Sequence, residues 1–124
     1  MMGQPNLPEE AQEKMQTLQE LQQTHEETLQ ALEDHREQYE SVVQAQSFLE
    51  QTDDETNVYR QVDDLLFELD YEEAEEHVQQ KLEKFESNIE ELEERHEQLE
   101  ERMEELGQEV QDIMSEEQPE GQPE

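Results

Sequence analysis

Apolar residues in the second half of the chain recur at alternating intervals of three and four. This heptad spacing is typical of a helix that packs one stripe of side chains against another helix. Asp70 followed by Glu73 resembles a capping box, so we expect a helix over about residues 71–114. The positions of this seam are Tyr71, Ala74, Val78, Leu82, Phe85, Ile89, Leu92, His96, Leu99, Met103, Leu106, Val110 and Ile113.

The first half carries a weaker seam with the same spacing. Pro8, Glu9 and Glu10 suit a first helical turn, so we expect a helix over about residues 8–51. If the two helices are antiparallel, the residue numbers in each layer sum to 120 or 121, and His25 shares a layer with His96. The first seam comprises Leu18, Leu21, His25, Thr28, Leu32, His35, Tyr39, Val42, Gln46 and Leu49.

The central stretch NVYRQVDDLLFELD interrupts this pattern and predicts a β-hairpin over about residues 57–69. With Asp63 and Asp64 as a two-residue turn, one face carries Val58, Arg60, Val62, Leu65, Phe67 and Leu69, and the other carries Tyr59, Gln61, Leu66 and Glu68. An isolated hairpin is marginal in water, so we expect it to pair with other hairpins and join several coiled-coil arms at their bases. A type I′ turn needs positive φ, which Asp tolerates less well than Gly, so the turn type stays open.

Composition disfavours a compact globular fold and several classes of partner. Only 29% of the 124 residues are hydrophobic, and 39 Asp and Glu against seven Lys and Arg give a net charge of -32. Nucleic acids and anionic membranes need clustered positive charge, so neither is an expected partner. Such an acidic, Lys-poor surface is typical of proteins adapted to molar salt, where a Debye length of about 3 Å screens the repulsion.

The sequence indicates no catalytic, cofactor-binding or metal-binding residues. Cysteine is absent, and the chain shows no Gly-rich phosphate loop and no nucleophile beside a base. The histidines His25, His35, His77 and His96 lack metal-ligand spacing along one helix. We therefore expect a protein that is not an enzyme and has no cofactor. The N-terminus resembles no signal peptide and no long apolar run occurs, which favours a cytoplasmic protein.

The order of these parts resembles the β subunit of archaeal prefoldin over roughly residues 7–107, with LPEEAQ at the start, NVYRQVDDLLFEL in the middle and DYEEAEEHVQQKLEKF after it. The resemblance implies a mainly α fold: a long antiparallel two-helix coiled coil whose central β-hairpin contributes to an intersubunit β-barrel. It also implies a heterohexamer of two α and four β subunits. Such a complex holds non-native polypeptides without ATP and passes them to a group II chaperonin. One departure is Asp63, where the family usually has Gly.

The resemblance divides the chain into a prefoldin β-like domain at 7–114 and disordered tails at 1–6 and 115–124. Assembly is expected to use Val58, Arg60, Val62, Leu65, Phe67 and Leu69. Client polypeptides are expected to bind Leu7, Met15, Leu18, Leu106, Val110, Ile113 and Met114, where the seam loses partner layers and its side chains should be partly exposed. The alternative is a structural or adaptor coiled coil that oligomerises through its hairpin, although such a protein would gain little from the apolar C-terminal residues.

Overall fold

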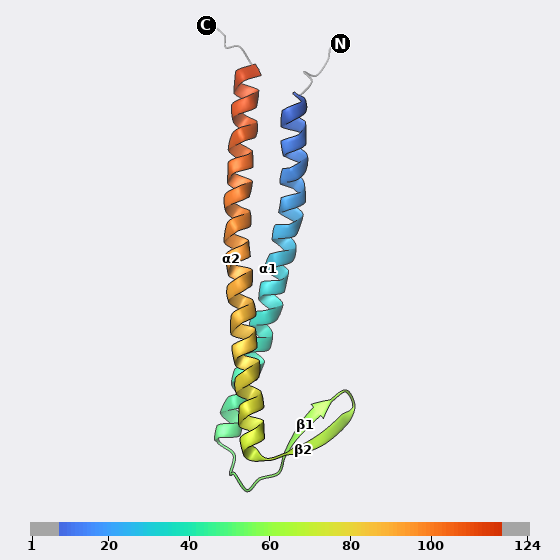
Figure 1. The fold of residues 1–124 in the computed structure, drawn as a ribbon, viewed down its shortest axis with the longest axis vertical. Coiled ribbons are helices and arrows are strands. Elements are labelled where there is room, and N and C mark those ends of the chain that lie inside the picture. The colour runs from blue at the N-terminus through green and yellow to red at the C-terminus, as the bar shows by residue number, and fades with distance from the viewer. Residues whose placement is uncertain (1–7, 118–124) are drawn as a thin grey trace. The chain divides into compact units, whose positions relative to one another are not determined.

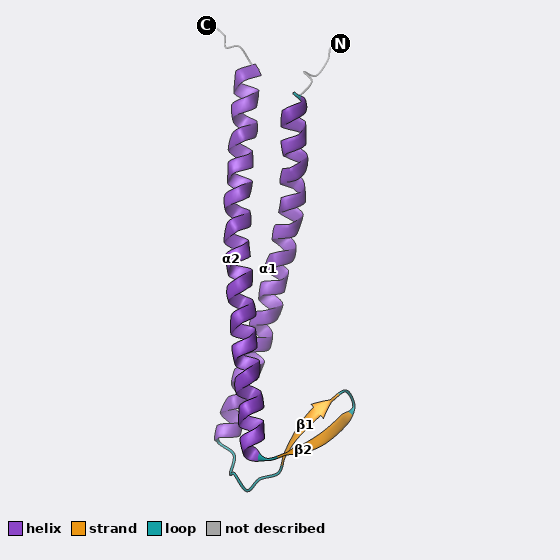
Figure 2. Ribbon diagram, in the orientation of Figure 1, coloured by secondary structure: helices purple, strands orange, loops and turns teal. Residues whose placement is uncertain are grey.

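The chain folds into two long helices with a small antiparallel hairpin between them, as expected (Figures 1 and 2). The structure is a computed structural model that describes residues 8–117. Its elements are α1 (Glu9–Glu50), β1 (Val58–Val62), β2 (Leu65–Leu69) and α2 (Tyr71–Glu117). The tail expected at 1–6 lies outside the described residues, as do residues 118–124 of the tail expected at 115–124.

The helix α2 ends three residues later than the sequence pattern predicted. Residues 115–117 were expected to belong to the C-terminal tail, but they are helical. Ser115, Glu116 and Glu117 are compatible with a helix, and backbone restriction begins only at the residue before Pro119. α2 therefore continues beyond the end of the apolar seam to the last residue that the structure describes.

Local hydrogen bonds explain where the helices begin. The Pro8 carbonyl accepts a 3.0 Å bond from the amide of Gln12, which opens α1. At the start of α2, the Asp70 carbonyl accepts from the Ala74 amide at 2.9 Å, and the Asp70 amide donates to the Glu73 carboxylate at 3.0 Å. The Glu73 bond is the expected half of a capping box, in which the third helical residue reaches back to the cap.

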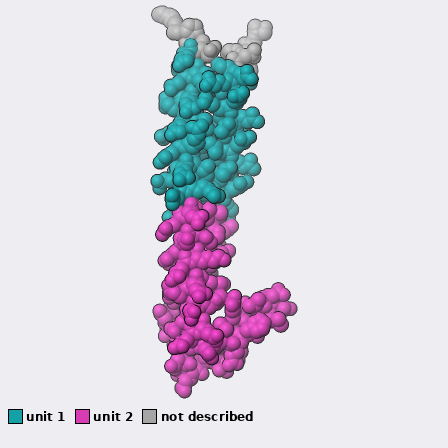
Figure 3. Space-filling model, in the orientation of Figure 1, with its two compact units in different colours: residues 1–30, 93–124 teal, residues 31–92 magenta. Residues whose placement is uncertain are grey.

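The chain divides into two compact units, which are described separately (Figure 3). Unit 1 comprises residues 1–30 and 93–124, so its described part holds the first half of α1 and the last part of α2. Unit 2 comprises residues 31–92 and holds the end of α1, the hairpin and the beginning of α2.

In unit 1 the two helices pack in the predicted register. The rings of His25 and His96 stack with their centroids 4.5 Å apart, which confirms that these residues share a layer. The apolar side chains of Ala11, Leu106 and Val110 are buried, and so is Thr28, whose hydroxyl donates to the Thr24 carbonyl at 2.8 Å. Unit 1 therefore has a narrow core made of one stripe of side chains from each helix.

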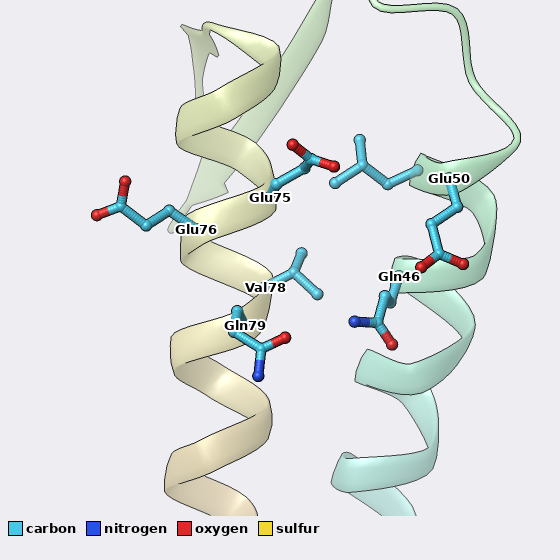
Figure 4. A pocket seen from close by; sticks show the side chains of 7 residues that line it. Gln46, Glu50, Glu75, Glu76, Val78 and Gln79 are labelled. Atoms are coloured by element: carbon cyan, nitrogen blue, oxygen red, sulfur yellow. The ribbon is translucent and has the colours of Figure 1, made fainter.

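The same register holds in unit 2. The Tyr71 hydroxyl donates to the Leu49 carbonyl at 2.6 Å, and the ring of His35 lies 6.0 Å from that of Phe85. Both pairs have residue numbers that sum to 120. Leu32, Ala74 and Leu82 are buried in this core. Figure 4 shows side chains from α1 and α2 of this unit pointing toward one another between the helices.

Candidate functional site

The hairpin forms with the predicted turn and register. Val62 pairs with Leu65, Arg60 with Phe67, and Val58 with Leu69, so Asp63 and Asp64 are the two turn residues. Asp63 has φ of 57°, and among the described residues other than Gly it alone has positive φ. A positive φ at the first central position only is the pattern of a type II′ turn rather than type I′. Gly is favoured at that position, so Asp63 holds a conformation that costs an L-residue free energy.

The expected assembly face of the hairpin is largely exposed in the single chain. Directly paired residues of antiparallel strands share a face, so the register places the six expected residues together. Leu65 is 59% exposed and Phe67 49%, whereas Val58 and Leu69, at the base, are half-buried. Figure 2 shows the hairpin standing away from the helices of unit 2. Exposed apolar strands with open edges are stable only when another surface covers them.

The opposite face and the end of α1 add apolar residues that the expected assembly set omitted. Leu66 is 66% exposed and Tyr59 52%, and both lie on the second face of the hairpin. Phe48, in the last turns of α1, is 71% exposed. The sequence carried a signal for Phe48, because a large aromatic residue off the seam of an amphipathic helix has no intrachain partner.

A groove between the hairpin and the helices of unit 2 holds two of the chain's seven positive side chains close to a histidine. Arg60 of β1 and Lys81 of α2 line this groove together with His77 and the apolar Leu69 and Val78. Burial lowers the pKa of His77, and the positive charges of Arg60 and Lys81 lower it further. A neutral imidazole is therefore favoured where the hairpin meets α2.

The expected client residues fall into two groups at the helix ends of unit 1. Met15 is 36% exposed, and Leu18, Ile113 and Met114 are half-buried. The expectation of partial exposure is wrong for the remaining two described residues, because Leu106 is 1% exposed and Val110 9%. Leu7 lies outside the described residues.

The burial of Leu106 and Val110 has a clear structural reason. The seam of α1 does not begin at Leu18, because Ala11 and Lys14 continue its spacing by three and four toward the N-terminus. The register places Ala11 opposite Val110 and Lys14 opposite Leu106. Ala11 is fully buried, and the Lys14 ammonium donates a 2.6 Å hydrogen bond to the Glu109 carboxylate.

Comparison with known proteins agrees with this architecture. Residues 12–117 match the family described as prefoldin subunit. The prefoldin subunit beta of Natronomonas pharaonis is 37% identical over 79 residues, which are 64% of this chain and 60% of that protein's length. The crystal structure of the prefoldin beta subunit from Thermococcus strain KS-1 matches with a TM-score of 0.81, over 94% of this chain and 100% of that one.

The structural match and the family match support different conclusions. At 22% identity, the Thermococcus structure shows a shared fold. The family match extends over most of α1, the whole hairpin and all of α2. None of the helices in residues 8–117 is both long and apolar enough to cross a membrane. By its sequence and its fold, the chain belongs to the prefoldin subunit family.

Proposed function

We propose that the chain is a β-type subunit of a prefoldin, a chaperone that holds non-native polypeptides without ATP and delivers them to a group II chaperonin. The observation that carries this proposal is the exposed hairpin, whose two faces present Leu65, Leu66 and Phe67 to solvent in the single chain. A coiled coil with such a hairpin is one arm of a larger assembly. Prefoldin subunits are a family of chaperones without enzymatic activity, and we propose no enzymatic activity here.

The proposed assembly is a heterohexamer of two α and four β subunits joined through their hairpins. Val58, Arg60, Val62, Leu65, Phe67 and Leu69 would face the interior of an intersubunit β-barrel. Strand pairing would satisfy the open edges of β1 and β2, and barrel closure would cover the apolar face. The net charge of -32 disfavours nucleic acid and anionic membranes as further partners.

Client polypeptides are proposed to bind at the helix ends of unit 1. Met15, Leu18, Ile113 and Met114 offer partly exposed apolar surface there. Flexible Met side chains adapt to varied sequences, and several weak arms on one platform gain avidity. Leu106 and Val110 would reach a client only when the helix ends separate, and Leu7 would join them from the preceding segment.

Assembly is tested by co-expression with a prefoldin α subunit, followed by mass measurement in molar KCl. The parent should give the mass of two α and four β chains. Phe67→Glu would bury an unpaired carboxylate in the barrel and should release chains that keep their helices. Gln61→Glu adds the same charge on the other face, where it loses the 3.1 Å hydrogen bond from Gln61 Nε2 to the Asp63 carbonyl, and it should still assemble. Normal assembly of Phe67→Glu would show that the assigned face is wrong.

Holdase activity separates a chaperone from an adaptor coiled coil. The reconstituted complex should suppress aggregation of a denatured substrate in high salt, and truncation after Gly107 should abolish this with the hexamer intact. Because the truncation also removes Glu109 and Val110, a second variant, Ile113→Ser with Met114→Ser, keeps the Lys14 bond and the buried layer. Undiminished activity of both variants would move client binding elsewhere and favour the adaptor alternative.

A further inference from the structure

Three potential metal ligands from both helices meet in unit 1. His25 comes from α1, and His96 and Glu100 lie one turn apart on α2. One ligand atom from each residue lies within 4.8 Å of the other two. Spacing along one helix did not indicate this group, because the ligands are contributed by two helices. We propose that His25, His96 and Glu100 bind one divalent transition-metal ion of the zinc class.

The distances fit metal coordination better than direct hydrogen bonding. The Nε2 atoms of His25 and His96 lie 3.5 Å and 3.6 Å from one Glu100 carboxylate oxygen. Good hydrogen bonds between nitrogen and oxygen span about 2.7–3.2 Å. Ligands bonded to Zn²⁺ at about 2.0–2.1 Å in a tetrahedron lie roughly 3.4 Å from one another. The two observed separations are therefore close to the edges of a zinc coordination tetrahedron.

His25 contributes a buried nitrogen that makes no hydrogen bond. Of the buried side-chain nitrogen and oxygen atoms in the described part of the chain, His25 Nε2 is one of two that have no hydrogen-bond partner. A neutral imidazole with its proton on Nδ1 presents a lone pair at Nε2. The two rings are stacked 27° from parallel, so the side chains would have to rotate to direct both lone pairs at a common point.

The chemical types of the three ligands indicate which ions the site would bind. Two imidazoles and one carboxylate suit Zn²⁺ and its neighbours in the transition series, whereas Ca²⁺ and Mg²⁺ prefer oxygen ligands alone. The Glu100 side chain is 56% exposed, which leaves an entry path and room for water at the fourth position. The strongly acidic surface raises the local concentration of cations, but it would bind them diffusely rather than at one site.

A bound ion would link α1 to α2 at a single layer of unit 1. Because the ligands come together only in the folded chain, the ion would stabilise the folded state by mass action. With free metal at 100 times the dissociation constant, the ratio of folded to unfolded chains should rise about 100-fold. The site would thus strengthen an arm without using the hairpin.

The test is titration of the metal-free full chain with ZnCl₂ in molar KCl, which screens diffuse binding by carboxylates. Isothermal calorimetry should give one saturable site per chain, and Co²⁺ at the same site should give the visible absorption of tetrahedral coordination. Zinc should also raise the melting temperature, and a chelator should reverse this. His96→Gln and Glu100→Gln should each bind at least about 10-fold more weakly, since each removes a direct ligand.

Matched controls distinguish this site from the surrounding charge. His77→Gln removes a histidine elsewhere, and Glu101→Gln removes the adjacent carboxylate; both should bind as the parent does. Because Glu100 is exposed, Glu100→Gln should keep its helicity, which circular dichroism checks before metal is added. Equal binding by the parent, His96→Gln and Glu100→Gln would overturn the proposal, as would the absence of a saturable site in the parent.

Discussion

The ammonium of Lys14 donates a 2.6 Å hydrogen bond to the carboxylate of Glu109, joining α1 to α2 beside the buried Leu106 and Val110. Lys14 occupies a seam position that an apolar residue would normally fill. Its methylene stem covers the seam while its charged end reaches the rim of the interface, as long cationic side chains commonly do.

This bond makes part of the stability of unit 1 dependent on pH. The hydrogen bond from Lys14 lowers the pKa of Glu109 below its usual value of 4.5, and the charges of Lys14 and Arg102 add to this against an opposing effect of burial. The stabilisation is present above pH 4.5 and is lost as the pH falls through the lowered pKa. We expect Glu109→Gln to lose less melting temperature on acidification than the parent, whereas Glu101→Gln should follow the parent. A parallel loss in Glu109→Gln and the parent would contradict the coupling.

His77 should titrate below its usual pKa of 6.5, because burial and then the charges of Arg60 and Lys81 disfavour the imidazolium. The unfolded chain then binds this proton more readily, so the contribution of His77 to stability falls as the pH drops from 6.5 toward the lowered value. NMR titration of the His77 ring measures this directly. Arg60→Gln should raise the midpoint, and a parent midpoint at or above 6.5 would refute the prediction.

Asp63→Gly should stabilise the hairpin by about 0.5 kcal/mol, because Gly relieves the strain at φ of 57° but adds freedom to the unfolded chain. Amide exchange at Val62 and Leu65 should slow roughly twofold. Asp64 has no such φ, so Asp64→Gly is the matched control and should accelerate exchange. The turn assignment fails if the two variants behave alike.

Leu106→Ala should destabilise the chain by about 2–5 kcal/mol, as expected for a fully buried leucine that leaves a cavity. Leu29, which is 43% exposed in the same unit, supplies the control. Leu29→Ala should change stability by no more than about 0.5 kcal/mol. Chemical denaturation in molar KCl measures both, and similar losses in the two variants would show that Leu106 does not pack as described.

Helicity should rise steeply between dilute buffer and molar KCl. Nine Glu against Arg95 and Arg102 lie between Glu90 and Leu106, and each like-charge pair four residues apart costs about 0.2–0.5 kcal/mol at low salt. Circular dichroism at 222 nm follows the change, with an uncharged osmolyte at equal osmolality as the control. Full helicity without salt would contradict this prediction.

The regular elements and their register could be predicted because helix geometry repeats. Once two heptad seams were aligned, His25 and His96 had to meet, and the strand pattern placed Val62 opposite Leu65. The continuation of the α1 seam through Lys14 could not be read from apolar spacing, since a charged residue interrupts that pattern. For the same reason, Leu106 and Val110 looked unpartnered in the sequence. The proximity of Glu100 to both histidines depends on side chains from two helices, which no spacing along one helix reveals.

The two attachments of the hairpin differ in length. Only Asp70 separates β2 from α2, and its capping bonds fix the step, whereas residues 51–57 connect α1 to β1. Because buried side chains such as Ala74 and Leu82 hold α2 against α1, one residue inserted at Asp70 would change the direction of the hairpin relative to α2 rather than the packing of the two helices. The longer connection at residues 51–57 would accommodate the same insertion within the loop itself. The hairpin is thus held rigidly to α2 and connected to α1 by a longer loop. Any bending of the helices relative to the hairpin should therefore be accommodated at residues 51–57.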